Sequence, residues 1–256
     1  MGTRCRYHGH VRRVLLALSA ALVVSSVWRD ASACGAAYPG GPVMCEYPRN
    51  KASAAKPPII RLTAGYAYTS TTLLFGSGRR ADLSRHAVLG GVEVPLASKL
   101  SLQVGAGGIA GGALTHGASR DEIGPGWSGY VGIAGRVVDG VGAAPFVQLT
   151  AAISTTHMLT RTLTDTPRYT AFDARVGAVV GKTFFDALTP YAVARAFGGP
   201  IYWRFDDEAV TGTDLYKYQL GGGVSLALLA RKVDLFVEGV AFGERGVAVG
   251  LGTTFF

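Results

Sequence analysis

The sequence is poor in charge and in long apolar runs. Only 16% of its 256 residues are Asp, Glu, Lys or Arg, against about 25% in an average soluble domain. Such low charge excludes a chain that is kept disordered by charge repulsion. The longest apolar run covers residues 14–27 and is shorter than the roughly 20 residues of a membrane-spanning helix. A helical membrane protein is therefore not expected.

Glycine, in contrast, is abundant. It makes up 36 of the 256 residues, roughly twice its usual share, and it is scattered without the three-residue period of collagen. Hydrophobic residues make up 48% of the chain. The composition indicates a β-rich chain that lacks the charged coat of a soluble protein.

The first 33 residues are predicted to be a secretory signal peptide. A basic start, the apolar run and the small-residue sequence Ala31-Ser32-Ala33 form its three parts. The pair Arg12-Arg13 leaves a twin-arginine signal open as a variant. Without the leader's five arginines and one aspartate, the net charge falls from +8 to +4. The basic balance is therefore no argument for a nucleic-acid partner.

Cysteine is scarce, and only Cys34 and Cys45 follow the leader. In an exported chain the two could form a disulfide, stay separate thiols, or leave Cys34 as a lipidated N-terminus. Neither a CxxC motif nor a zinc site is present. Residues 34–57 are rich in Ala, Pro, Gly and Lys without an apolar period. We predict that they form a flexible periplasmic segment.

From residue 58 onward, short segments of alternating apolar and polar residues follow one another. This alternation predicts β-strands with one apolar face. Most segments reach the 9–11 residues that a tilted strand needs to cross a bilayer. We predict ten strands, at 58–75, 86–96, 100–112, 127–138, 145–159, 169–185, 191–203, 215–229, 233–242 and 247–256.

The predicted connections alternate in length. Those after the first, third, fifth and seventh segments span about 10, 14, 9 and 11 residues, and those after the second, fourth, sixth and eighth about 3, 6, 5 and 3. Long outer loops and short periplasmic turns are typical of outer-membrane β-barrels. Aromatic residues also gather at the predicted strand ends, as in the two girdles of such barrels. They are Tyr66, Tyr68, Phe75, Trp127, Tyr169, Tyr202, Trp203, Tyr216 and Tyr218 at the outer end, and Phe184, Phe185, Tyr191, Phe255 and Phe256 at the inner end.

These features favour an all-β fold, an antiparallel up-and-down transmembrane β-barrel over 58–256. About ten strands are expected, with eight to twelve possible. A soluble periplasmic β-protein is the alternative, but its water-facing side would carry more charge.

The export signal, the alternating strands and the terminal Phe256 resemble small Gram-negative outer-membrane β-barrel proteins, the broad group with the outer membrane protein A and W types. The resemblance implies an outer-membrane location, both barrel termini in the periplasm, and insertion by the barrel assembly machinery. Phe256 departs from the group's pattern, because it falls on the face opposite Phe255 and Leu251. A bulge or a register slip in the last strand would explain this.

Eight residues, Asp234 among them, make up nearly all the charge on the polar strand faces, and the other seven are expected to meet in a narrow lumen. They are Arg61, Glu93, Arg136, Asp173, Arg175, Lys217 and Glu238. A charge at low dielectric needs a partner, so this set either fills the lumen as a paired plug or lines a narrow polar path. Eight-stranded barrels are filled by side chains, and only much larger ones leave a water channel.

No catalytic, metal or cofactor site is predicted. His86, His116 and His157 are expected near the outer end, where a hydrolase would need a serine or carboxylate beside a histidine. Ser154 lies three residues before His157, so the two side chains lie on opposite faces of their strand.

Two loop clusters could bind ligands or simply stay hydrated. The arginines Arg79, Arg80, Arg85 and Arg120 of the predicted outer loops could pair with lipopolysaccharide phosphates. The acidic run 206–208 lacks the spacing of a calcium loop.

The function expected from the sequence is a non-enzymatic structural or surface-interaction barrel. A narrow, porin-like channel for small polar or amphipathic solutes is the alternative, and a surface hydrolase of lipid acyl or peptide bonds ranks third. The expected partners are outer-membrane lipid and lipopolysaccharide, with no nucleic acid and no cofactor. The barrel is expected to be a monomer.

Overall fold

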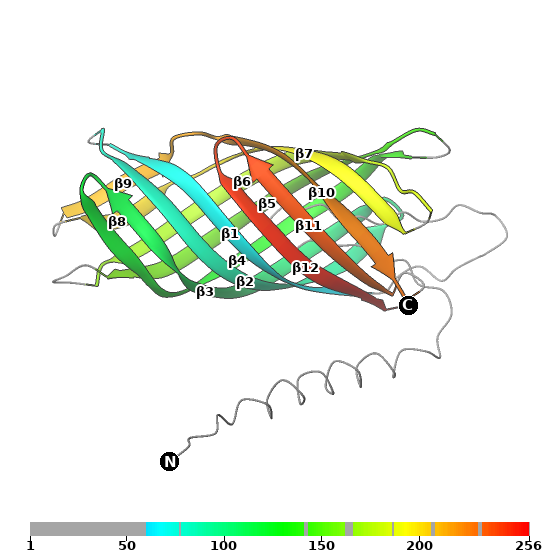
Figure 1. Ribbon diagram of the computed structural model, residues 1–256, viewed down its shortest axis with the longest axis horizontal. Coiled ribbons are helices and arrows are strands. Elements are labelled where there is room, and N and C mark those ends of the chain that lie inside the picture. The colour runs from blue at the N-terminus through cyan, green and yellow to red at the C-terminus, as the bar shows by residue number, and fades with distance from the viewer. Residues whose placement is uncertain are drawn as a thin grey trace, which may run out of the picture. The chain divides into compact units, whose positions relative to one another are not determined.

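The structure, a computed structural model, describes residues 60–76, 78–140, 143–161, 166–185, 187–205, 208–229 and 232–255. The signal peptide, the segment 34–57, both of its cysteines, residues 206–207 and Phe256 lie outside the described residues. The strands are β1 (Ile60–Phe75), β2 (Arg80–Ala97), β3 (Leu100–His116), β4 (Ser119–Asp139), β5 (Phe146–Arg161), β6 (Arg168–Gly181), β7 (Leu188–Gly198), β8 (Ile201–Phe205), β9 (Glu208–Asp214), β10 (Tyr218–Leu228), β11 (Val233–Ala241) and β12 (Arg245–Phe255) (Figure 1).

The strands form one antiparallel sheet that closes into a barrel. Each strand from β1 to β6 pairs with the next in sequence, and β12 returns to pair with β1 from Ile60↔Phe255 to Ser70↔Arg245. The predicted all-β, antiparallel barrel fold is confirmed. The described part of β12 keeps a continuous register with both neighbours, so a bulge in the last strand is not observed there.

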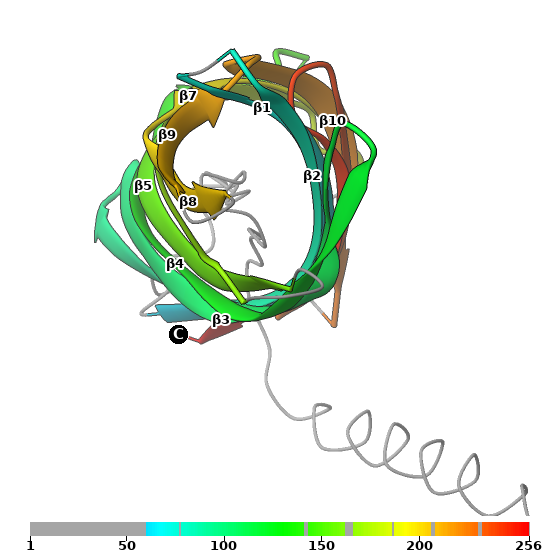
Figure 2. The same cartoon turned by 90° about the vertical axis from the view of Figure 1, so that its left-hand side faces the viewer.

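The two ends of the barrel differ in strand number. At the end that holds Ile60 and Phe255, here the near end, the ring consists of β1 to β7 and β10 to β12, ten strands in all. At the opposite, far end, β8 pairs with β6 and β9 pairs with β1, so eight strands close the ring. Figure 2 looks onto the far end, where the β8–β9 hairpin forms part of the wall.

The narrowing arises because the β11–β12 hairpin is short. β11 ends at Ala241 and β12 begins at Arg245, so β1 loses this partner beyond Ser70. β9 takes its place, with Leu73 opposite Asp214. The chain between β9 and β10 thus passes over the hairpin tip, which closes the wall without leaving a free strand edge.

The predicted long connections are mostly strand, which corrects the loop lengths expected from the sequence. Most residues of 76–85, 113–126 and 204–214 belong to β2, β3, β4, β8 and β9, whereas in 160–168 the described strand residues are Thr160, Arg161 and Arg168. The turn-forming residues in these segments suggested loops. Their alternate positions, such as Leu83, Leu114 and Ile123, are nevertheless buried inside the barrel, and pairing them into hairpins satisfies the backbone there.

The outward face of the strands is apolar. Exposed residues on it include Leu62, Val88, Val92, Val104, Val131, Ile133, Leu149, Ile153, Val176, Leu220, Val224, Leu235, Val237, Val249 and Leu251. A soluble protein rarely exposes a continuous apolar surface of this extent, whereas a lipid-facing band requires one. Among the described residues, no helix is long and apolar enough to cross a membrane.

The aromatic girdles are only partly as predicted. Tyr66, Tyr68, Trp127, Tyr202, Tyr216, Tyr218, Phe184, Phe185 and Phe255 are exposed, as girdle residues should be. Phe75, Tyr169, Trp203 and Tyr191 are instead buried inside the barrel. Position near a strand end did not reveal the face to which these four rings belong.

Many glycines leave room for large side chains inside the barrel. A Cβ at Gly105 would lie 2.4 Å from Cε1 of Tyr130, and one at Gly181 would lie 2.6 Å from Cζ of Phe146. Both rings are buried. The excess of glycine therefore has a packing role in addition to allowing curvature and close strand approach.

Ile153→Arg should destabilise the membrane-inserted barrel by about 2–4 kcal/mol, because Ile153 lies midway along β5 on the outward face and is 61% exposed. Thr211→Arg, on the exposed β8–β9 hairpin, should cost at most about 1 kcal/mol. Urea unfolding of both variants in lipid vesicles would measure the difference. Equal costs would contradict a lipid-facing band.

Candidate functional site

The inside of the barrel is filled in layers. At the far end lies an apolar plug of buried residues, Leu73, Phe75, Ala81, Leu83, Ala87, Leu89, Ile109, Leu114, Ile123, Met158, Tyr169, Ile201 and Trp203. These residues come from β1 to β6 and β8, all of them strands of the eight-stranded ring. The narrower ring places opposite walls close enough for their inward side chains to meet, as in small barrels filled by side chains.

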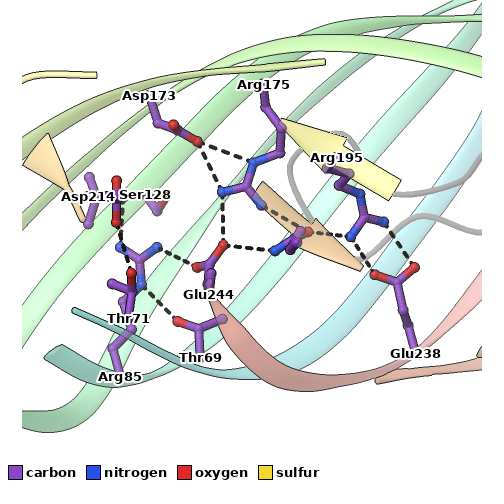
Figure 3. Close-up of polar contacts among 12 residues, drawn as sticks. Thr69, Thr71, Arg85, Ser128, Asp173, Arg175, Arg195, Asp214, Glu238 and Glu244 are labelled. Atoms are coloured by element: carbon purple, nitrogen blue, oxygen red, sulfur yellow. Dashed lines mark hydrogen bonds and ion pairs between the residues drawn. The ribbon is translucent and has the colours of Figure 1, made fainter. Parts of the chain in front are cut away.

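Toward the near end, the plug gives way to a charged cluster. This cluster, here the lumen network, consists of Arg85, Asp173, Arg175, Arg195, Gln219, Glu238 and Glu244 (Figure 3). Arg195 and Glu238 form a two-pronged pair, with Nη1–Oε1 at 2.7 Å and Nη2–Oε2 at 3.0 Å. The hydroxyl of Tyr191 also donates to Glu238. Parallel charge-assisted bonds of this kind are among the stronger polar contacts in proteins.

Arg175 links the Arg195–Glu238 pair, through Gln219, to the other two carboxylates of the network. Its Nη2 lies 3.0 Å from Oδ2 of Asp173 and 3.0 Å from Oε2 of Glu244. Gln219 is fully buried, accepts from Nη1 of Arg195 at 2.7 Å, and donates to Glu244 at 3.1 Å. The amide of Gln219 thereby bridges the two groups of ions across the lumen.

Glu244 reaches the lumen from the tip of the short β11–β12 hairpin. Phe242 and Gly243, just before it, have φ values of +66° and +68°. These left-handed conformations turn the chain within three residues. The Glu244 side chain is then buried among arginines, with Arg85 on the other side at 3.8 Å.

Arg85 is not in an outer loop, which corrects its predicted role as a lipopolysaccharide contact. It belongs to β2, and its guanidinium donates to the hydroxyls of Thr69 and Thr156 inside the barrel. The strand extends past the turn-forming residues that suggested a loop. Arg79, Arg80 and Arg120 are exposed at the far end, where contact with lipopolysaccharide stays a prediction.

A second ionic group lies at the near end of the barrel. Arg61 pairs with Asp234, Nη2–Oδ2 at 2.7 Å, and lies 3.5 Å from Glu93. All three residues are buried. The structure thus brings together two of the predicted network residues and adds Asp234, which is 173 positions from Arg61 in sequence.

Two other predicted residues lie apart from these groups. Arg136 stacks its guanidinium 4.7 Å from the ring centre of Phe146. Lys217 is exposed in the irregular stretch between β9 and β10. Its strand pattern pointed inward, but the chain leaves regular pairing where it passes over the hairpin tip.

The arrangement favours a filled lumen. The lumen network contains three arginines and three carboxylates in mutual contact, and Asp214, labelled beside them in Figure 3, adds a fourth carboxylate to the lining of the adjoining cavity. A cavity between the network and the plug has a volume of about 60 Å³, enough for a few water molecules.

Arg195 and Glu244 were missed by the sequence interpretation. Arg195 shares its face of β7 with Tyr191, Val193 and Phe197, all buried. The opposite face carries mostly small residues, three alanines with Leu188 and Pro190 near its start, so the face with the larger apolar side chains suggested lipid contact. Glu244 lies in a turn, outside any strand pattern. The only signal for Glu244 in the sequence was its charge within the turn Gly243-Glu244-Arg245.

The three histidines lie apart. His86 contacts Tyr66, and His157 contacts Thr170 on the outward side. His116 lies at the far end with its Nε2 3.2 Å from Oδ2 of Asp121. The structure thus shows one His–Asp pair that sequence reasoning could not assemble.

Ser154 and His157 do lie on opposite faces, since Ser154 lines the lumen cavity. In the part of the chain that the structure describes, no group of three or more His, Cys, Asp or Glu residues could hold a metal ion.

No protein-family model matches the chain, and no curated protein is similar to it in sequence. Solved structures do match. The outer membrane protease OmpT from Escherichia coli shares 9% identity at a TM-score of 0.51, over 80% of this chain and 100% of that one. The translocator domain of the autotransporter NalP from Neisseria meningitidis shares 12% identity at a TM-score of 0.42, over 96% of each chain. The COG4313 outer membrane channel from Pseudomonas putida F1 shares 8% identity at a TM-score of 0.39, over 82% of this chain and 100% of that one.

The chain has the fold of an outer-membrane β-barrel. The likeness to OmpT carries this conclusion and, at 9% identity, extends to the fold alone. A likeness of fold alone does not select a function.

Proposed function

We propose that this chain is a non-enzymatic barrel of the Gram-negative outer membrane that presents its far end at the cell surface with its lumen closed. The observation that carries the proposal is the double filling of the lumen, by the apolar plug and by the ion pairs of the lumen network. Both termini would lie in the periplasm, and insertion would use the barrel assembly machinery. The barrel would act as a monomer.

The far end supports a surface role. The hairpins β1–β2, β3–β4 and β8–β9 end there, and exposed arginines Arg79, Arg80 and Arg120 belong to two of them. Guanidinium groups suit the phosphates of lipopolysaccharide. Hairpins stiffened by strand pairing lose little conformational entropy on contact with a partner.

Planar-bilayer recordings test the closed lumen. We expect the purified full-length protein to give no discrete conductance steps at neutral pH, because both layers block the passage of ions. A large porin added afterwards to the same bilayer must give steps, which shows that the assay detects channels. Discrete steps from this protein alone would contradict the proposal and favour the narrow channel.

A further inference from the structure

A crevice opens at the far end, on top of the apolar plug. Its cavity volume is about 310 Å³, several times that of the lumen cavity and within the range of small-molecule pockets, about 300–1,000 Å³. The β1–β2 turn, the β3–β4 turn and the β8–β9 hairpin contribute its walls. We call it the far-end crevice.

The floor of the far-end crevice is aromatic and held in place. Phe75 and Trp203 lie with their ring centres 5.7 Å apart, and Val210 flanks them. Nε1 of Trp203 donates to Oγ1 of Thr160 at 3.0 Å, which fixes the orientation of the indole ring. A floor that is already ordered binds a flat apolar group without the entropic cost of rearrangement.

The rim of the crevice is cationic. Arg79 and Arg80 line it and are exposed, and His116, on the adjacent strand β3, lies with its ring centre 5.6 Å from that of Trp203. No carboxylate occurs among the described residues that line the crevice. Asp121, which contacts the lining residue His116, is buried. The combination suits a ligand with an apolar ring and a single negative charge.

We infer that the far-end crevice binds a small aromatic carboxylate, with its ring on Phe75 and Trp203 and its carboxylate at Arg79 and Arg80. A phosphorylated acyl glycolipid is far larger than a cavity of about 310 Å³, and inorganic phosphate would gain nothing from the aromatic floor. The inference goes beyond the proposed function, since a closed lumen does not require a pocket at its mouth.

Tryptophan fluorescence gives a direct test. The full-length Trp28→Phe/Trp127→Phe variant keeps Trp203 as its single tryptophan, and it can be measured in vesicles of zwitterionic lipid. Benzoate should change the emission of Trp203 in a saturable manner. Benzyl alcohol, which has the same ring and no charge, should bind at least about tenfold more weakly because it forms no charge-assisted bond.

Substitutions at the rim measure how much the arginine charges contribute to the binding of benzoate. Arg79→Gln/Arg80→Gln should remove the preference for benzoate and leave the weak binding of benzyl alcohol unchanged. Arg120→Gln, at the same end but outside the crevice lining, should retain the preference. Unchanged heat-modifiable gel mobility and unchanged Trp203 emission without ligand would show that each variant is folded.

Three results would overturn the inference: no saturable response to benzoate, equal affinity for benzyl alcohol, or a preference that survives the loss of both arginines. Competition by inorganic phosphate at concentrations below that of benzoate would also overturn it. The bilayer recordings above do not depend on the crevice, so failure of one proposal leaves the other to be judged separately.

Discussion

Gly243→Ala is expected to prevent the barrel from folding. A Cβ at this position would lie 1.9 Å from the carbonyl oxygen of Tyr218, a contact that a backbone carbonyl cannot relieve by rotating away. The φ of +68° adds strain for any L-residue. Because the glycine lies at the tip of the β11–β12 hairpin, the passage of the chain from β9 to β10 over this tip would be lost with it.

Two other glycines distinguish the effect of the steric clash from the effect of the positive φ. Gly117 has a φ of +57° but open space around its Cβ position, and Gly239 has neither a positive φ nor a neighbour within 4 Å. Gly117→Ala should therefore cost about 1 kcal/mol, and Gly239→Ala less than about 0.5 kcal/mol. The fraction of heat-modifiable protein and the urea midpoint in vesicles would measure all three. A Gly243→Ala protein as stable as Gly117→Ala would mean that the hairpin tip does not lie beneath Tyr218.

Arg195→Met should destabilise the barrel by about 3–5 kcal/mol, because it leaves Glu238 buried without its two-pronged partner. Glu238→Leu should have a similar effect through the reverse imbalance. The double variant Arg195→Met/Glu238→Leu should lose less than either single variant, since two apolar side chains of similar volume often replace a buried ion pair at little cost.

Urea unfolding of the four proteins in lipid vesicles gives the coupling energy of the pair. Arg120→Met, an exposed arginine at the far end, serves as the control and should change stability by less than about 0.5 kcal/mol. If each single variant at the pair costs no more than this control, water must reach Arg195 and Glu238. The lumen network would then not be a dry plug, and the proposed closed lumen would lose its main support.

The sequence predicted the barrel well because the alternation of side chains is a local property. In β1, Leu62 and Tyr66 face outward while Arg61 and Ala67 are buried, as their period of two requires. Alternation shows which residues share a face, but it does not show which face is inside. In β7 the inward face is the more apolar one, and Arg195 was missed there for this reason.

The candidate site depended on contacts between distant segments. Arg85 and Trp203 both lie beside turn-forming residues, and only pairing with other strands shows that they point inward. The partner of Arg175, Glu244, is 69 positions away and lies in a turn. Local patterns contain no information on such pairs.

The sequence by itself determined that the chain folds as an antiparallel barrel of about ten strands with an apolar outer band and few charges inside. Only the tertiary structure decided that the barrel narrows from ten strands to eight, and that the low charge and abundant glycine serve a filled lumen. The physical reason is the short β11–β12 hairpin. β1 must change its partner where that hairpin ends, and the smaller ring brings the inward side chains of opposite walls into contact.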